Sequence, residues 1–149
     1  MDDIRRILVT TDFSDTSKLA LGPARTLAKR FGARIVLAHV VEDALPPLVA
    51  EYMAVGVQEI VDQQVERARE RLAQFARDHL SDFPDAETVT SVGTPHIEIV
   101  RLAEEGRADL VVMATHGRGF ISHAVLGSTT ERVLRRATCP VLVAREARS

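Results

Sequence analysis

Three short polar segments of this chain combine residue types that can hold a phosphorylated sugar. Residues 10–14 (TTDFS) and residues 115–119 (THGRG) each follow an aliphatic run, and residues 127–130 (GSTT) precede a helical pattern. Backbone amides and hydroxyls at the start of a helix suit a phosphate group. A carboxylate such as Asp12 accepts hydrogen bonds from ribose hydroxyls in other nucleotide-binding folds. The three segments therefore predict a phosphate and sugar site, provided that the fold brings them together.

Ordinary structural roles compete with this interpretation. Asp12 can simply end a strand, Ser128 can simply cap a helix, and an isolated glycine-containing loop is a weak signal. Asp12, His116 and Ser128 also supply the residue types of a hydrolytic triad, but no Gly-x-Ser-x-Gly elbow supports that reaction. The five histidines include no closely spaced pair on one helix, so a metal site is not expected.

Strands and helices alternate along the chain. Continuous aliphatic runs at residues 7–9, 35–41, 110–114 and 141–144 predict strands that are covered on both faces, and residues 86–92 predict a weaker strand. Helical periodicity covers residues 57–80, 95–105 and 128–137, with Thr94 as the N-cap of the second of these and Gly106 at its end. A further helix runs from Ser14 towards Phe31, with a kink or a late start at Gly22-Pro23. Within residues 57–80, the charged side chains from Glu66 to Arg71 are expected mostly on the solvated face.

This order predicts one α/β domain over residues 1–149, with a parallel sheet and right-handed crossovers. In such a sheet a ligand binds beyond the carboxyl ends of the strands, where the winding direction reverses. Residues 42–56, which contain Pro46-Pro47, are expected to form an irregular excursion.

Composition narrows the classes of function. The 149 residues carry a net charge of −2 and only 4% aromatic residues, so binding to nucleic acid is not expected. No apolar run approaches the ~20 residues that span a bilayer, so no membrane partner is expected. The single cysteine, Cys139, forms no internal disulfide. We therefore expect a globular protein of the cytoplasm.

At the level of motifs, the chain resembles the universal stress protein family. The likeness lies in residues 10–14, 39–41 (HVV), 113–119 (MATHGRG), 126–128 (LGS) and 139–143 (CPVLV), and it extends over essentially the whole chain. The family's nucleotide loop reads Gly, two residues, Gly, nine residues, Gly, then Ser or Thr. Here Gly117, Gly127 and Ser128 match this pattern, whereas Ala114 occupies the position of the first glycine.

The resemblance implies a doubly wound five-stranded parallel sheet of strand order 3-2-1-4-5, with helices on both faces. It also implies an ATP site between strands one and four, with Mg²⁺ arriving on the phosphates, and a regulatory role in the stress response. Asp12 would bind the ribose, Thr11 and the backbone of Val40 would line the adenine pocket, and Met113 and Ala114 would flank the sugar. The phosphates would lie against Gly117, Gly127, Ser128 and Thr129, and His116 and Arg118 would be further contacts from the loop.

The last strand raises the question of a protein partner. As an edge strand with no charge before Arg145, it invites pairing with a second copy. The family commonly dimerises through this strand, which implies an interface at Val141, Leu142 and Val143.

Two alternatives to an ATP-binding protein stay open. Ala114 favours a dimeric interaction protein that has lost the nucleotide, and a small hydrolase using His116 and Ser128 is the weaker option. ATP hydrolysis, if present, would be slow, because no residue is identified as a general base. The sequence does not name the protein partner of any of these.

Overall fold

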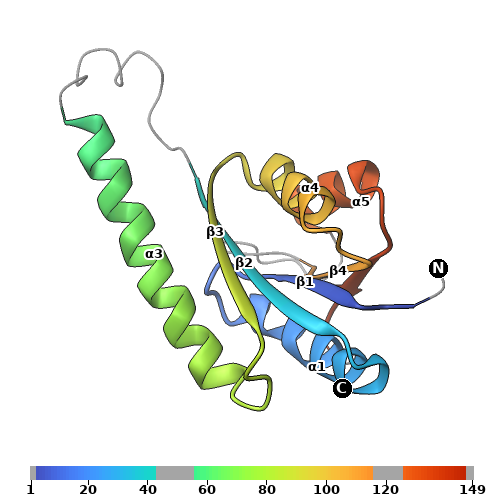
Figure 1. Cartoon of the computed structure of the whole chain (residues 1–149). Coiled ribbons are helices and arrows are strands. Elements are labelled where there is room, and N and C mark those ends of the chain that lie inside the picture. The colour runs from blue at the N-terminus through green and yellow to red at the C-terminus, as the bar shows by residue number, and fades with distance from the viewer. Residues whose placement is uncertain (1–2, 43–55, 116–125, 147–149) are drawn as a thin grey trace.

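The computed structural model describes residues 3–42, 56–115 and 126–146, and these residues form a doubly wound α/β sheet (Figure 1). Five parallel strands lie in the order β3-β2-β1-β4-β5. Their bounds are β1 Arg6–Thr10, β2 Arg34–Glu42, β3 Glu87–Gly93, β4 Leu110–Ala114 and β5 Val141–Ala144. The expected fold class and strand order are confirmed.

Helices cover both faces of the sheet. The helices of the described residues are the short 3₁₀ helix η1 (Thr16–Ala20), α1 (Leu21–Phe31), α3 (Val57–His79), α4 (Pro95–Glu105) and α5 (Ser128–Arg136). One apolar cluster joins α1 and α3 to the sheet, and a second joins α4 and α5 to its other face (Figure 1).

The central strands are apolar on both sides because each face of the sheet is covered. In β1, Val9 packs in the cluster of α1 and α3, whereas Leu8 packs in the cluster of α4 and α5. Neighbouring residues of β4 divide in the same way, with Val112 on the first face and Val111 on the second. Because both faces are buried, the strand sequences are continuous aliphatic runs rather than alternating apolar and polar residues.

Helix boundaries follow local signals in the sequence. Near Gly22-Pro23 the helix does start late, because η1 precedes α1, and α1 ends at Gly32 with a left-handed φ of 65°. At α4, Thr94 occupies the N-cap position and Pro95 the first turn. The expected N-cap position of Thr94 is confirmed, and its side chain makes no capping hydrogen bond. Pro95 itself pre-forms the first turn, because its fixed φ is helical.

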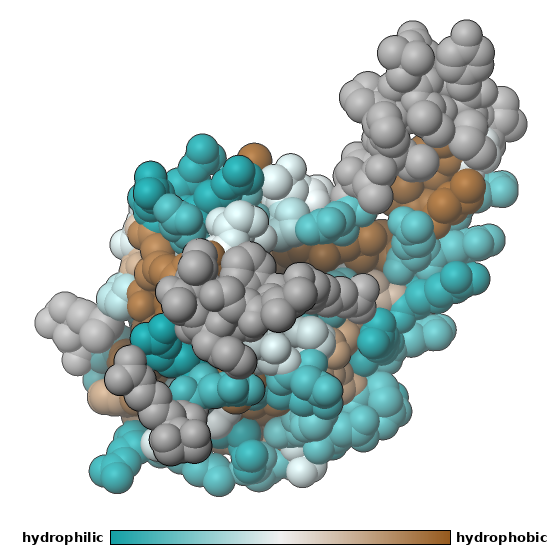
Figure 2. Space-filling model, turned by 180° about the vertical axis from the view of Figure 1, so that it is seen from behind, coloured by the Kyte–Doolittle hydropathy of each residue, from teal (hydrophilic) through white to brown (hydrophobic). Residues whose placement is uncertain are grey.

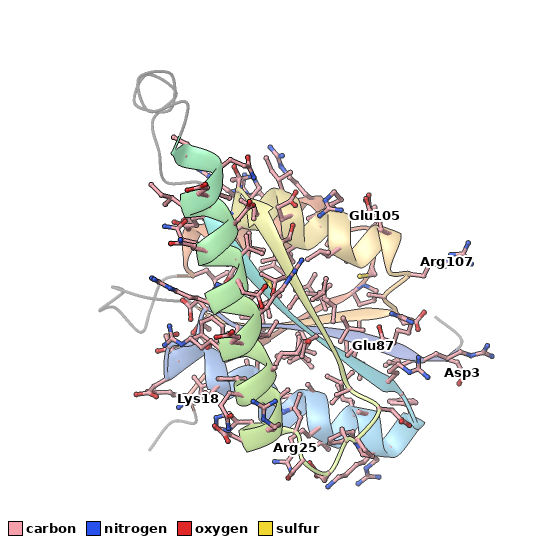
Figure 3. All side chains as sticks on the ribbon, turned by 60° about the vertical axis from the view of Figure 1, so that its left-hand side comes forward. Asp3, Lys18, Arg25, Glu87, Glu105 and Arg107 are labelled. Atoms are coloured by element: carbon pink, nitrogen blue, oxygen red, sulfur yellow. The ribbon has the colours of Figure 1, made fainter. Side chains whose placement is uncertain are left out.

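Charged side chains lie mainly on the surface (Figures 2 and 3), and one group of them lies at the amino ends of β1, β2 and β3. Glu87 of β3 pairs there with Arg34 at 3.0 Å and Arg6 at 3.4 Å, which links the three neighbouring strands. Such exposed pairs contribute little to the free energy of unfolding. Among the described residues, no helix has the length and apolar content needed to cross a membrane.

His96 is a buried titratable group on α4, close to the positive charges of α5. It belongs to the first turn of α4, and only 7% of its surface is exposed. Desolvation lowers the pKa of His96 below 6.5, and the positive charges of Arg132 and Arg136 on α5 lower it further. The folded protein therefore holds this imidazole neutral near pH 7.

We expect this burial to make the protein less stable in mild acid. Below the unfolded pKa of 6.5 the unfolded chain binds a proton at His96 more readily than the folded chain, so stability falls as pH falls. Urea unfolding should give a free energy of unfolding that decreases from about pH 7.5 to about pH 5.5. His96→Gln should make this dependence on pH weaker. If the free energy of unfolding depends equally on pH in the unmodified protein and in His96→Gln, His96 is not the cause of that dependence.

Candidate functional site

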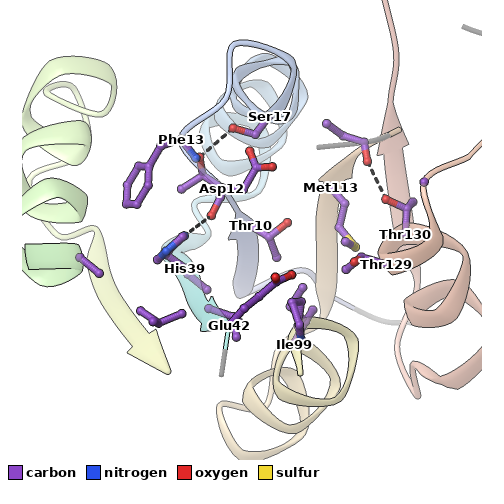
Figure 4. Close-up of a pocket in the computed structure, with 18 of the residues that line it drawn as sticks. Thr10, Asp12, Phe13, Ser17, His39, Glu42, Ile99, Met113, Thr129 and Thr130 are labelled. Carbon is purple, nitrogen blue, oxygen red and sulfur yellow. Dashed lines mark hydrogen bonds between the residues drawn. The ribbon is translucent and has the colours of Figure 1, made fainter. Parts of the chain in front are cut away.

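A cavity of about 750 Å³ lies across the carboxyl ends of β1, β2 and β4 and the start of α5 (Figure 4). This is the place where the winding of the sheet reverses, because the chain leaves β1 and β4 towards opposite faces. The described residues that line it are Thr10–Phe13, Ser17, Ala38–Glu42, Gln64, Arg67, Ala68, Arg71, Pro95, Ile99, Met113, Ala114 and Gly127–Thr130.

The turn after β1 is fixed by a buried hydrogen-bonded network around Thr11. The hydroxyl of Thr11 bonds to that of Ser17 at 2.8 Å and accepts the amide of Phe13 at 3.0 Å. The Thr11 carbonyl accepts Nδ1 of His39 at 2.8 Å, so that ring nitrogen carries the proton. Thr11 therefore contributes a rigid wall to the cavity, while its hydroxyl serves the turn.

Asp12 follows in the same turn and lies near the middle of the cavity (Figure 4). Its Oδ1 accepts the backbone amide of Ser14 at 3.0 Å, which forms a local Asx turn. This hydrogen bond fixes the direction of the carboxylate, and the half-buried residue stays partly accessible. A group held in this way can accept hydrogen bonds from a ligand hydroxyl.

Phe13 has a backbone conformation that side chains rarely adopt, with a φ of 68°. Three neighbours surround its ring: His39 at 4.3 Å and Phe75 at 6.0 Å between ring centroids, and the guanidinium carbon of Arg71 at 4.4 Å from the centroid. Backbone strain of this kind costs about 1–3 kcal/mol and often occurs at ligand sites. The packing of the ring and the bond from its amide to Thr11 offset that cost.

The opposite side of the cavity is the first turn of α5. Gly127 is the N-cap residue, and its amide donates to the Thr115 carbonyl at 2.7 Å. The first bond inside the helix runs from Glu131 to Gly127, so the amides of residues 128–130 have no acceptor within the helix. No side chain caps this helix end, and Thr130 instead donates to the Ala114 carbonyl at 2.9 Å. This end of the cavity therefore attracts anions.

Ala114 ends β4, and its backbone does not need glycine. Among the described residues, the ones with positive φ are Phe13, Arg107, Gly32 and Gly93. Ala114 is buried, with 7% of its surface exposed, and pairs with Ala144 of β5. The methyl group is therefore compatible with the strand, although the family pattern has glycine at this position.

Most of the residues proposed from the sequence gather around this one cavity. They are Thr11, Asp12, Val40, Met113, Ala114, Gly127, Ser128 and Thr129. His116, Gly117 and Arg118 lie outside the described residues, so neither the loop contacts nor a triad through His116 can be placed. At the sheet edge, Val141, Leu142 and Val143 are half-buried in β5.

The side of the cavity formed by α3 was not predicted from the sequence. Gln64, Arg67, Ala68 and Arg71 line it from α3, and the two arginines were expected simply on the solvated face. They are exposed, as expected, but at the rim of the cavity. Their spacing of three and four residues beside the buried Leu72 and Phe75 was the available signal. No group of three or more His, Cys, Asp or Glu side chains able to hold a metal occurs in the part of the chain described here.

Comparison with known proteins assigns this chain to a family. The sequence pattern of the Universal stress protein family matches residues 3–145. A universal stress protein of Methanocaldococcus jannaschii, MJ0531, is 33% identical over 95% of this chain and 82% of its own length. The chain belongs to the universal stress protein family, as the resemblance implied.

Solved structures show the same fold. The structure of the hypothetical protein MJ0577 is 28% identical, with a TM-score of 0.83 over 98% of this chain and 99% of that one. A universal stress protein solved in complex with cAMP is 26% identical, with a TM-score of 0.63 over 98% of this chain and 100% of that one.

Proposed function

We propose that this protein binds an adenine nucleotide, ATP, in the cavity between β1 and β4, and acts as a nucleotide-dependent regulator in the stress response. The observation that carries the proposal is the meeting of Asp12 and the amide-rich start of α5 around one cavity of about 750 Å³. The relative solved with cAMP, an adenine nucleotide, supports the choice of ligand. ATP is an intracellular metabolite, so the proposal places the protein in the cytoplasm.

The cavity has residues of suitable chemistry for each part of the nucleotide. The phosphates would lie against Gly127, Ser128 and Thr129, where helix amides and hydroxyls donate hydrogen bonds. The ribose would lie at Asp12, beside Met113 and Ala114. The adenine would lie along the backbone of Val40 and the wall made by Thr11. The family resemblance would add Gly117 to the phosphate site, with His116 and Arg118 as further contacts, and these three residues lie outside the described part of the chain.

Mg²⁺ would arrive with the phosphates rather than through a protein site of its own. Magnesium commonly keeps several waters and binds through substrate phosphates with one or two carboxylates. The side chains of Asp12 and Glu42 both line the cavity and suit contact with its water shell. The proposal needs no further metal ligand from the chain.

ATP would act on this protein as a conformational ligand. A ligand changes the balance between two conformations only by binding one of them more tightly. The proposal assigns no catalytic residue, and any hydrolysis of ATP would be slow. The regulated protein partner is not identified by the site.

The rival function is a family member that has lost its nucleotide, and Ala114 is the feature that favours it. The structure weighs against this reading, because Ala114 needs no special backbone conformation and its methyl group is accommodated in β4. A methyl group at this position leaves the amides of α5 and the carboxylate of Asp12 in place.

We expect Asp12→Asn and Gly127→Val each to weaken ATP binding by about tenfold or more. Asp12→Asn removes the negative charge of the carboxylate that would accept hydrogen bonds from the ribose hydroxyls. The second adds methyl groups beside the phosphates at a backbone of φ −61° and ψ 151°, which tolerates a β-branched residue. Calorimetric titration with ATP measures both variants. Gly22→Ala is the matched control, because nothing lies within 4 Å of the added atom.

Ala114→Gly separates the two functions in the same titration. If the protein binds ATP, restoring the family's glycine should change its affinity by less than about threefold. If instead the unmodified protein shows no binding and no change in melting at millimolar ATP, while Ala114→Gly binds, then the nucleotide-free reading is correct. If Asp12→Asn and Gly127→Val both bind ATP as tightly as the unmodified protein, the nucleotide does not bind at this cavity.

The proposal extends to the assembly, in which two chains pair through β5. Within the described residues β5 pairs only with β4, and its Val141, Leu142 and Val143 are uncharged. An apolar edge strand of this kind is a template for another strand. Pairing with its own copy would close the assembly by two-fold symmetry.

Light scattering at micromolar concentration should give the mass of a dimer. Val143→Lys places a charge on the edge strand and should give the mass of a monomer. Val92→Lys on β3, the other edge of the sheet, is the matched control and should stay dimeric. A monomer mass for the unmodified protein would rule out the assembly.

A further inference from the structure

The cavity extends beyond the residues of the family motif and ends on two arginines of α3. Arg67 and Arg71 line it together with Gln64. Because α3 packs against β2 and β3, whereas Thr130 of α5 bonds to β4, these two helices border opposite ends of the cavity (Figure 4). The α3 end is therefore separate from the phosphate site at the start of α5.

Arg67 and Arg71 are suitably placed to bind an anion together. They are four residues apart on one helix, so they lie on the same face, and Gln64 precedes Arg67 by three residues. Between the described residues, no ion pair or hydrogen bond neutralises either guanidinium, whereas Arg69 between them lies 3.9 Å from Glu66. Two adjacent guanidiniums and an amide supply the donors that phosphate oxygens accept.

Arg71 is held in position before any ligand arrives. Its guanidinium carbon lies 4.4 Å from the centroid of the Phe13 ring, and stacking on an aromatic ring restricts a long side chain. Phe13 is itself fixed by the bond from its amide to Thr11 and by its contacts with His39 and Phe75. The cationic wall is thus connected to the same turn that positions Asp12.

The carboxylates of the cavity do not face this wall. In Figure 4, Phe13 lies between Asp12 and α3, and Glu42 extends towards Ile99, away from α3. The lining therefore has amides at the α5 end, carboxylates in the middle and guanidiniums at the α3 end. A ligand that complements this order carries an anion at each end and hydroxyl donors between them.

We propose that Arg67 and Arg71 form a second anion subsite, so that the cavity prefers a nucleotide with two separate phosphate groups, one at α5 and one at α3. This inference rests on the proposed function, because it takes the first phosphate site and the ribose position from it. The ligand class is an adenosine bisphosphate, with one phosphate on the 5′ oxygen and the other on the 2′ or 3′ oxygen. The single free ribose hydroxyl then faces the carboxylates.

Calorimetric titration at low ionic strength compares AMP with adenosine 2′,5′-bisphosphate and adenosine 3′,5′-bisphosphate. The unmodified protein should bind one of the bisphosphates about tenfold more tightly than AMP, and the pair of ligands identifies which oxygen carries the second phosphate. The double variant Arg67→Gln, Arg71→Gln should lose this preference and keep its affinity for AMP within about threefold. Arg69→Gln, on the same helix but outside the cavity, should retain the preference.

The outcomes separate this inference from the proposed function. If AMP, ATP and both bisphosphates all fail to bind, the proposed function is wrong. If AMP binds and neither bisphosphate binds more tightly, or if the preference survives in the double variant, the second subsite is refuted. Far-ultraviolet circular dichroism of each variant checks that it is folded, and Arg67→Lys with Arg71→Lys should keep a preference because both charges remain.

Discussion

Parallel pairing of β1 with β2 on one side and β4 on the other is the constraint on which the site depends. β1 pairs in register with both strands, and the chain leaves β1 and β4 towards opposite faces of the sheet. Right-handed crossovers require this divergence where the strand order reverses, and it leaves a space at the carboxyl edge. The strand ends that form the floor of the cavity are held by the most deeply buried residues of the core, such as Val9 and Val112. The floor of the cavity is therefore fixed by the packing of the sheet.

The two sides of that space meet a ligand with different chemistry. On the β1 side, Thr11 uses its hydroxyl and carbonyl to fix the turn, and this fixes the strained Phe13 and the carboxylate of Asp12. On the β4 side, the helix start of α5 offers backbone amides, and Thr130 ties it to the end of the strand. The proposed mononucleotide would use both sides, since its sugar donates hydrogen bonds and its phosphates accept them.

The strands and helices could be predicted from the sequence because each depends on local pattern. Continuous aliphatic runs marked the two-sided strands, and Gly22-Pro23 and Gly32 marked the ends of α1. Alternation of the elements predicted a parallel sheet, but the order β3-β2-β1-β4-β5 came from the family resemblance.

Part of the candidate site was predictable for the same reason, and part was not. Asp12 and Ser128 stand next to aliphatic or helical patterns, so their polar character marked them. Arg67 and Arg71 look like solvated helix residues, and they reach the cavity only through the way a 23-residue helix packs across β2 and β3. The role of Phe13 depends on a backbone torsion of 68°, which is set by tertiary contacts.

Nuclear magnetic resonance of the backbone amides during titration with ATP reports which of the two turns the nucleotide contacts. If one nucleotide contacts both turns, the amides of Thr11–Phe13 and of Ser128–Thr130 should shift together and saturate with a single affinity. The amides near Lys29 and Asp82, which line a separate cavity of about 400 Å³, should not move. Shifts confined to one of the two turns, or centred on Lys29 and Asp82, would contradict a nucleotide site between β1 and β4.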